Sequence, residues 1–319
     1  MTVASRPRSR RRRLARAAAV TGTALAVIGL GTPAIAAPAR QVYVAMGDSF
    51  AAGPLILPQS DLFTCARSSS NYAGLLAKKI DVATLRDVTC SSATTENFAN
   101  SQAGNVFGTA APQYNALSTD TTLVTVQIGG NDIGLVGLAE SCINLLPQTG
   151  VIDAPVLGKS CKATNTAGGV DQYARKIDAF APTYGTVIDQ IRKRAPKARI
   201  LMVGYPTGIQ PGGCWPFVPV LPQDADYIQA NIDRLNTRMA QQSAKHGATY
   251  VDIRTPSIGH DACQGIGTKW IEGVIPTVID NGIAPLHPNA AGMAGVVPAL
   301  QKALGSSTAA GSRTKLAKS

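Results

Sequence analysis

The sequence is poor in the residues that metal, thiol redox and nucleic-acid sites require. It has only three histidines in 319 residues, and none of its six cysteines belongs to a Cys-x-x-Cys pair, the spacing typical of zinc clusters and redox centres. Charged residues make up 15% of the chain, and no group of lysines and arginines lies among aromatic residues in its body, as a nucleic-acid groove would need. We therefore expect no metal, no organic cofactor and no nucleic-acid partner.

An apolar run long enough to span a membrane, about 20 residues, is also missing. The segment Met1 to Arg16 carries seven arginines and no acidic residue, and the apolar stretch that follows it is short and interrupted by threonine and glycine. Small residues at Ala34 and Ala36 suit signal peptidase. We interpret 1–36 as a signal peptide, partly similar to a twin-arginine signal, and expect a secreted, extracellular protein without a stable membrane anchor.

The net charge of +11 comes mostly from the two ends of the chain. The signal segment carries seven of these charges, and residues 306–319, which we predict to be a flexible basic tail, carry three more. The segment 37–305 is close to neutral, so the basic balance is no evidence for nucleic-acid binding. Its length suffices for one well-buried catalytic domain.

An even number of cysteines in an exported chain predicts three disulfides. Fifteen pairings are possible in principle. Pairing between neighbours along the chain would close one long surface excursion with each bridge. We therefore predict the pairs Cys65–Cys90, Cys142–Cys161 and Cys214–Cys263.

Short apolar runs that are typical of strands alternate with helical patterns, which predicts a mainly parallel sheet covered on both faces. The expected strands are 41–46, 85–89, 121–128, 199–204 and 248–253. The expected helices are 71–79, 171–194 (one helix or two, with Pro182 at the interruption), 224–245 with Asp224 as N-cap, and 289–304. Two Gly-, Pro- and Cys-rich stretches, 135–169 and 205–223, do not fit these layers. The second is either a disulfide-held surface loop or a wall of a substrate cleft formed by Trp215 and Phe217.

Two motifs follow predicted strands. Ser49 stands in Gly-Asp-Ser after the first strand, where a hydroxyl and nearby N–H groups can face a ligand, although an ordinary turn has the same composition. The tetrapeptide Gly-Gly-Asn131-Asp follows the strand 121–128. Its glycines allow a tight turn, and Asn131 offers the neutral amide donor of an oxyanion hole.

A serine nucleophile usually needs a histidine base, and elimination favours one of the three. His246 ends a long helix, where a histidine is expected for capping and dipole reasons. His260 lies near Cys263 in a predicted stapled loop and is the alternative. His287 stands in a loop after the last strand and just before the last helix, so it can curl back over the strand ends; we predict that it is the base.

Together these blocks resemble the SGNH (GDSL) hydrolase family, and most closely its secreted actinobacterial esterases and lipases. The resemblance implies a flavodoxin-like, three-layer α/β/α fold. It also implies ester hydrolysis through an acyl-serine at Ser49 with His287 as base. The implied oxyanion hole consists of the Ser49 N–H, the Asn131 side chain and a backbone N–H that the family takes from a glycine.

The sequence departs from the family at two positions. Ser92 stands where that glycine is expected, and a backbone N–H donor can come from a serine as well. The family places an aspartate three residues before the histidine to orient the imidazole, and here that residue is Ala284. Asp280 lies seven residues before His287. We therefore predict a Ser49–His287 dyad whose imidazole N–H donates to a backbone carbonyl, that of Ala284.

The predicted function is that of a secreted serine esterase or lipase acting on lipid-type acyl esters. The exposed apolar residues expected around Trp215 favour a lipid substrate. A carbohydrate acetyl esterase would use the same residues, and a non-catalytic secreted binding protein would keep the fold alone. The expected partner is an ester or lipid substrate, and we expect a monomer.

Overall fold

The protein is described from a computed structural model, which covers residues 40–146, 154 and 156–316. The predicted signal peptide, 1–36, lies outside the described residues.

The central sheet has five parallel strands in the order β4-β1-β7-β8-β9. In chain order this is the 2-1-3-4-5 arrangement of a flavodoxin-like sheet, which confirms the predicted fold class. The strands are β1 (Val42–Gly47), β4 (Thr84–Asp87), β7 (Leu123–Gln127), β8 (Arg199–Val203) and β9 (Thr249–Val251). Four further short strands form two antiparallel pairs outside this sheet: β2 (Gln59–Asp61) with β3 (Arg67–Ser68), and β5 (Gln102–Ala103) with β6 (Thr109–Ala110).

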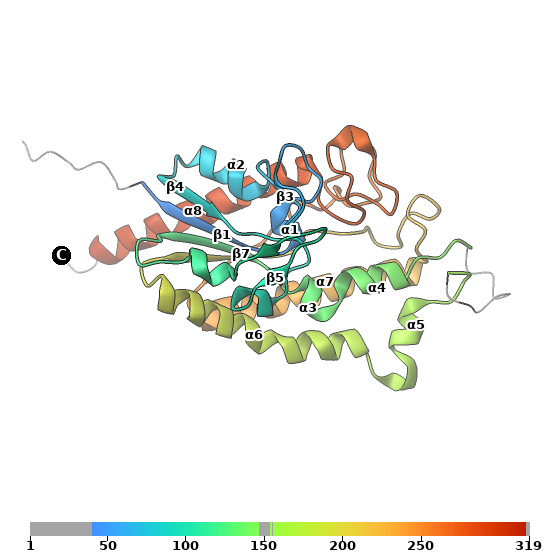
Figure 1. The fold of residues 1–319 in the computed structure, drawn as a ribbon. Coiled ribbons are helices and arrows are strands. Elements are labelled where there is room, and N and C mark those ends of the chain that lie inside the picture. Colours follow the sequence, from blue (N-terminus) through green and yellow to red (C-terminus); the bar gives the residue numbers. More distant parts are fainter. Residues whose placement is uncertain (1–39, 147–153, 155, 317–319) are drawn as a thin grey trace, which may run out of the picture. The chain divides into compact units, whose positions relative to one another are not determined.

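Long helices cover both faces of the sheet (Figure 1). One face carries α2 (Tyr72–Lys79) and α8 (Ala290–Leu316), and the other carries α6 (Gln172–Arg194) and α7 (Pro222–Lys245). The short helices are α1 (Ser49–Ala52), α3 (Gly130–Ile133), α4 (Leu135–Ser141) and α5 (Cys161–Asn165), together with single 3₁₀ turns at Thr95–Phe98, Gln113–Ala116, Ala167–Gly169 and Val278–Asp280.

Alternating side chains of β1 divide the core between the two faces. Val44 and Met46 belong to the cluster beneath α6 and α7, whereas Tyr43 and Ala45 belong to the cluster beneath α2 and α8. All four side chains are fully buried. The strand is therefore apolar throughout because successive side chains point to opposite, equally covered faces.

The structure decides one alternative that the sequence left open and corrects one helix start. Pro182 lies inside one continuous helix α6. Helix α7 begins at Pro222, and a proline in the first turn suits a helix start because its missing N–H would have had no intrahelical partner. Asp224 is consequently not the N-cap. Its carboxylate instead accepts hydrogen bonds from the Ser160 hydroxyl and from the first N–H groups of α5.

The last helix is longer than predicted. Helix α8 continues from Ala290 to Leu316, into the segment 306–319 that we expected to be a flexible tail. The extension contains no proline, so no residue there removes a backbone hydrogen bond from the helix.

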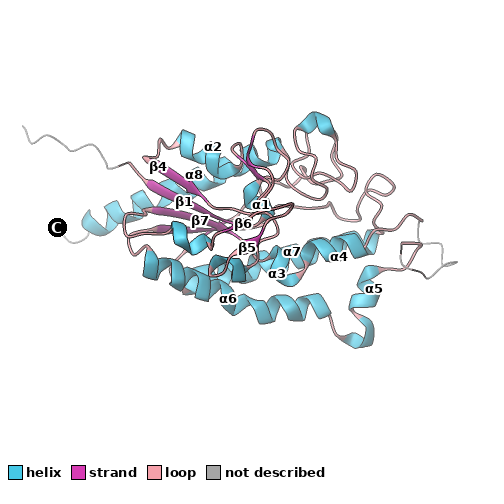
Figure 2. Ribbon diagram, in the orientation of Figure 1, coloured by secondary structure: helices cyan, strands magenta, loops and turns pink. Residues whose placement is uncertain are grey.

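The three predicted disulfides are present. Cys65–Cys90, Cys142–Cys161 and Cys214–Cys263 have Cα–Cα separations of 4.3, 4.9 and 5.6 Å. Figure 2 shows long loops beyond the carboxyl ends of the central strands. Among the described residues, no helix combines the length and the apolar composition that a bilayer crossing requires.

Candidate active site

Ser49 is the first residue of a helical turn that follows β1 directly. Gly47 has a φ of +146°, and a Cβ there would lie 2.3 Å from the Gln127 carbonyl oxygen of β7, so only glycine fits this close approach. Asp48 is the N-cap of the turn, and its side chain accepts the N–H of Phe50 at 2.9 Å. The serine is thereby held at the carboxyl edge of the sheet, with 5% of its surface exposed.

His287 reaches this serine from the loop between β9 and α8. Its Nε2 lies 2.8 Å from the Ser49 Oγ, and its Nδ1 lies 2.7 Å from the carbonyl oxygen of Pro285. A carbonyl can only accept, so Nδ1 carries the proton and Nε2 is free to accept the serine proton. Burial lowers the pKa of His287, against the opposing effect of the Pro285 carbonyl, and this favours the neutral, basic imidazole near neutral pH.

The sequence analysis predicted that the carbonyl beside the imidazole is that of Ala284. This prediction is wrong, because the carbonyl beside Nδ1 is that of Pro285. The Ala284 oxygen accepts the backbone N–H of His287 at 3.3 Å. Leu286 adopts a left-handed conformation with φ +60°, which is uncommon for a residue with a branched side chain. Within this turn the next carbonyl, that of Pro285, is the one beside Nδ1.

Asn131 follows the neighbouring strand β7. The turn begins at Gly129 with φ +116°, where a Cβ would lie 2.3 Å from the Tyr184 hydroxyl. One N–H of the Asn131 amide donates to the Ala93 carbonyl at 2.9 Å. The carboxamide has a second N–H, which can donate to a ligand. Asp132 accepts from the Thr95 N–H and hydroxyl, so the turn is attached twice to the segment after β4.

Ser92 belongs to that segment. Its φ of +68° lies in the left-handed region, where the family's glycine would adopt the conformation without steric cost. The exposed Ser92 hydroxyl donates to Asn105 Oδ1 at 2.8 Å. Ser49, Ser92 and Asn131 thus follow three strands that are neighbours in the sheet, β1, β4 and β7.

The other candidate residues have different partners. The ring of His246, at the end of α7, lies 3.0 Å from the Asp189 carboxylate. His260 Nδ1 lies 2.6 Å from the Thr268 carbonyl, and its ring stacks on Trp270. Asp280 accepts from the Gly267 N–H and the Thr277 hydroxyl, each at 3.0 Å.

An apolar pocket has Phe50 and Leu286, the chain neighbours of Ser49 and His287, in its wall. The remaining wall comes from α4, α7 and the loops after β8 and β9, with side chains that include Leu135, Val136, Ala139, Ile209, Val218, Val220, Ile228, Ile232, Ala262, Ile271 and Val274. The two predicted cleft residues are not among them. Phe217 is 86% exposed, and Trp215 donates its indole N–H to the Asn144 carbonyl. The loop does form a wall, through Val218 and Val220.

A family model described as GDSL-like Lipase/Acylhydrolase matches residues 45–294, which include each of these site residues. The chain belongs to this family.

Named relatives of this GDSL-like protein are streptomycete enzymes. Lipase 2 of Streptomyces coelicolor is 36% identical over 292 residues, which cover 88% of this chain and 93% of that protein. The lipase of Streptomyces rimosus is 30% identical, with 92% and 98% covered. The crystal structure of phospholipase A1 from Streptomyces albidoflavus NA297 is similar with a TM-score of 0.61 and 27% identity, covering 83% of this chain and 99% of that one. The protein is a carboxylic ester hydrolase of the lipase and esterase class.

Some residues of the GDSL-like site escaped the sequence interpretation. Tyr205 entered that interpretation only as the first residue of the stretch 205–223, yet its hydroxyl contacts the turns of both sequence motifs. Its position at a strand end, shared with Ser49 and Asn131, was the available signal. Within the described part of the chain, no group of three His, Cys, Asp or Glu side chains is arranged to hold a metal ion.

Proposed function

We propose that the protein hydrolyses lipid-type acyl esters through an acyl-Ser49 intermediate, with His287 as general base and acid. His287 Nε2 takes the Ser49 proton as Oγ attacks the ester carbonyl carbon, and then delivers that proton to the departing alcohol. A water molecule next attacks the acyl-enzyme, with its proton passing to Nε2. Collapse of the second intermediate releases the acid and returns the proton to Ser49. The observation that carries this proposal is the 2.8 Å contact between Ser49 Oγ and His287 Nε2.

Three donors would stabilise the oxyanion. We assign them to the backbone N–H groups of Ser49 and Ser92 and to the side chain of Asn131. They follow three adjacent strands, and the Asn131 amide also bonds to Ala93, next to Ser92. Donors that are fixed before the reaction stabilise developing charge without reorganising.

The Pro285 carbonyl takes the orienting role that an aspartate has in a triad. It holds the Nδ1–H tautomer of His287. Being neutral, it stabilises the protonated imidazole less than a carboxylate does.

The apolar pocket supports an acyl chain as the bound group. Burying apolar chain carbons stabilises the complex by about 0.8 kcal/mol for each CH₂, and side chains of α4 and α7 surround the pocket. An acetyl group, the acyl part of the alternative carbohydrate substrates, leaves such a pocket unfilled. The printed descriptions of the relatives as lipases and a phospholipase favour the same substrate class.

We further propose that the enzyme acts outside the cell after cleavage at Ala36. The arginine-rich start and small residues near 34–36 support export, as does a similar structure described as an extracellular lipase from Streptomyces rimosus. The mass of the enzyme recovered from culture medium should correspond to a chain beginning at Ala37.

Labelling with a fluorophosphonate tests the chemistry. We expect one stable adduct, on Ser49, and an adduct on any other serine would refute the assignment. A panel of p-nitrophenyl esters from acetate to stearate tests the substrate class. Activity that rises from acetate to longer chains supports the lipid substrate, activity on acetate alone supports the carbohydrate esterase, and no activity with any ester supports the non-catalytic binding protein.

A further inference from the structure

One buried hydroxyl, that of Tyr205, joins the two sequence motifs of the site. It accepts the Gly130 N–H at 2.8 Å and lies 2.5 Å from Asp48 Oδ2, to which it donates. Gly130 immediately precedes Asn131, and Asp48 immediately precedes Ser49. The same hydroxyl therefore contacts the turn of the nucleophile and the turn of the amide donor.

The Asp48 carboxylate connects the Tyr205 hydroxyl to the helical turn of Ser49. Its other oxygen accepts the Phe50 N–H at 2.9 Å and caps the helical turn that Ser49 begins. The Phe50 ring lies between two rings of the site, with centroid distances of 5.1 Å to Tyr205 and 5.3 Å to His287. A displacement of Tyr205 would therefore displace both Ser49 and His287.

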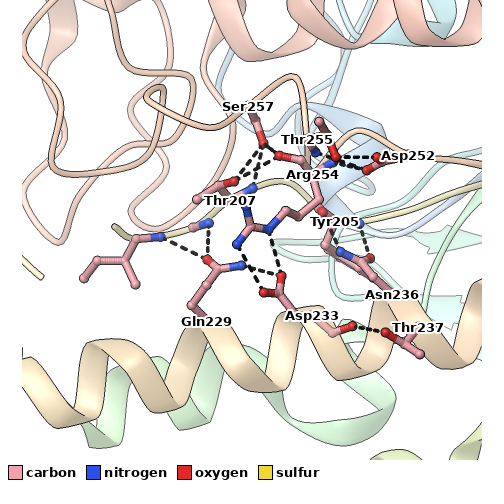
Figure 3. A network of polar contacts seen from close by, with 12 residues as sticks. Tyr205, Thr207, Gln229, Asp233, Asn236, Thr237, Asp252, Arg254, Thr255 and Ser257 are labelled. Carbon is pink, nitrogen blue, oxygen red and sulfur yellow. Dashed lines mark hydrogen bonds and ion pairs between the residues drawn. The ribbon is translucent and has the colours of Figure 1, made fainter. Parts of the chain in front are cut away.

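Tyr205 is itself fixed from the opposite side. Asn236 of α7 accepts the Tyr205 N–H at 2.7 Å and donates to the Tyr205 carbonyl at 2.8 Å, and Figure 3 shows this pair of bonds. Two residues further on, the Thr207 N–H donates to the Ser257 hydroxyl in the same polar network. The tyrosine is 1% exposed, so packing holds its hydroxyl in one position between the two turns.

We infer that Tyr205 is a positioning residue, whose hydroxyl sets the Ser49 turn and the Asn131 turn at the relative placement that the oxyanion requires. The inference rests on the proposed function, because it assigns the oxyanion to donors on these two turns. The turns follow different strands, β1 and β7, and a displacement of about 1 Å between reacting groups can cost about 100-fold in rate.

The hydrogen bond between Tyr205 and Asp48 should make activity depend on pH through the ionisation state of Asp48. Burial raises the pKa of Asp48 to about 7, opposed by the hydrogen bonds from Tyr205 and Phe50, while the Asp132 carboxylate raises it further. Tyr72 and Tyr184 are the other titratable groups that interact with it. The Asp48 carboxylate accepts hydrogen bonds from the Phe50 N–H and the Tyr205 hydroxyl. The protonated acid carries a proton on one of these two oxygens, which weakens the hydrogen bond to that oxygen. Activity should therefore rise as the pH rises through about 7.

The first experiment compares Tyr205→Phe with Tyr43→Phe. Tyr43 is a matched control because it is also fully buried and its hydroxyl bonds to Thr125 at 2.8 Å, in the cluster on the α2 and α8 side. With p-nitrophenyl butyrate we expect Tyr205→Phe to lower kcat by about 100-fold, with KM changed by less than about threefold. Fluorophosphonate labelling should slow by a similar factor. Tyr43→Phe should lower the Tm but leave kcat within about twofold.

The second experiment records kcat against pH. In the wild type the acid limb should lie near the Asp48 pKa of about 7. In Asp48→Asn it should move to lower pH, because the limb then reports His287, whose pKa is lowered from its ordinary value by burial. In Tyr205→Phe it should move to higher pH, because Asp48 loses a donor that lowers its pKa. The double variant Tyr205→Phe, Asp48→Asn should have a kcat no lower than that of the slower single variant, because both substitutions remove the same Tyr205–Asp48 hydrogen bond.

The outcomes separate the two proposals. If Ser49→Ala keeps its activity, the proposed function fails. If Ser49→Ala is inactive while Tyr205→Phe keeps the wild-type kcat, only the positioning role fails. If Tyr205→Phe does not fold, Asp48→Asn decides, since an acid limb unchanged from the wild type would also overturn the link.

Discussion

At the scale of single residues, the site departs from its family at two positions. The Pro285 carbonyl faces the imidazole where the family uses a carboxylate, and Ser92 adopts the left-handed conformation that the family gives to glycine. In both cases the group to which we assign a role is part of the main chain, so a change of side chain leaves it in place.

Asp280 is the nearest aspartate before His287 in the sequence, and its role should be structural. Asp280→Ala removes the acceptor of the Gly267 N–H and the Thr277 hydroxyl, which costs about 1–3 kcal/mol of stability. It should leave kcat within about threefold of the wild type, whereas Ser49→Ala should lower kcat by about 10⁴-fold or more. Steady-state kinetics and thermal melts check both values. A loss in Asp280→Ala as complete as that in Ser49→Ala would contradict the carbonyl-supported dyad.

Asn131 should contribute to the transition state far more than to substrate binding. Asn131→Ala should lower kcat by about 10²–10³-fold, as the loss of one oxyanion donor does in other serine hydrolases, with little change in KM. The kinetics of p-nitrophenyl butyrate hydrolysis measure this. Asn165→Ala is a suitable control, because the Asn165 amide likewise donates to a backbone carbonyl, that of Cys161 in α5, and it should leave kcat close to the wild type. Similar losses in both variants would argue against the assigned donor.

At the scale of elements, the sheet and the helices have separate tasks. The ends of β1, β4 and β7 carry the nucleophile and the donors assigned to the oxyanion, whereas α4, α7 and the loops after β8 and β9 surround the pocket assigned to the acyl chain. Acyl-chain preference should therefore change independently of kcat when the helices are altered.

Ala139 of α4 offers a test of this separation. Its side chain lines the pocket, so Ala139→Phe should fill space needed by long chains. We expect kcat/KM to fall about tenfold or more for decanoate and longer esters and to stay near the wild type for butyrate. Gly137→Ala, on the same helix, is the control because an added Cβ there meets no atom within 4 Å. Equal losses for short and long esters would place the acyl chain elsewhere.

At the scale of the whole molecule, the disulfides stabilise the end of the sheet that carries the site. The bridge Cys214–Cys263 spans 49 residues and connects the loops after β8 and β9. Val218 and Ala262, which lie near its two ends in the chain, both line the pocket.

Removing this bridge should weaken the fold and the pocket together. On the chain-entropy account, the double variant Cys214→Ala and Cys263→Ala should lose about 4 kcal/mol of unfolding free energy. KM for long-chain esters should rise more than KM for butyrate, because the pocket wall is less constrained. Urea melts and ester kinetics measure the two effects. An unchanged ratio of the two KM values would show that the loop does not touch the acyl chain.

Much of this fold could be predicted from local patterns. The strand 121–128 is apolar on both faces and corresponds to the buried β7, and pairing of neighbouring cysteines was correct because each bridge closes one excursion. The start of α7 was misjudged because Asp224 matches an N-cap by type, while its carboxylate bonds to α5 instead.

The sequence alone determined the fold class, the three disulfides and the pairing of Ser49 with His287, because periodicity, cysteine order and strand-end motifs are local properties of the chain. Only the tertiary structure decided that Pro285 and not Ala284 faces the imidazole, since this depends on the left-handed turn at Leu286. It also decided which residues line the pocket and that Tyr205 meets Asp48, 157 residues away in the chain. Such contacts depend on how separate elements pack, and no local pattern records that packing.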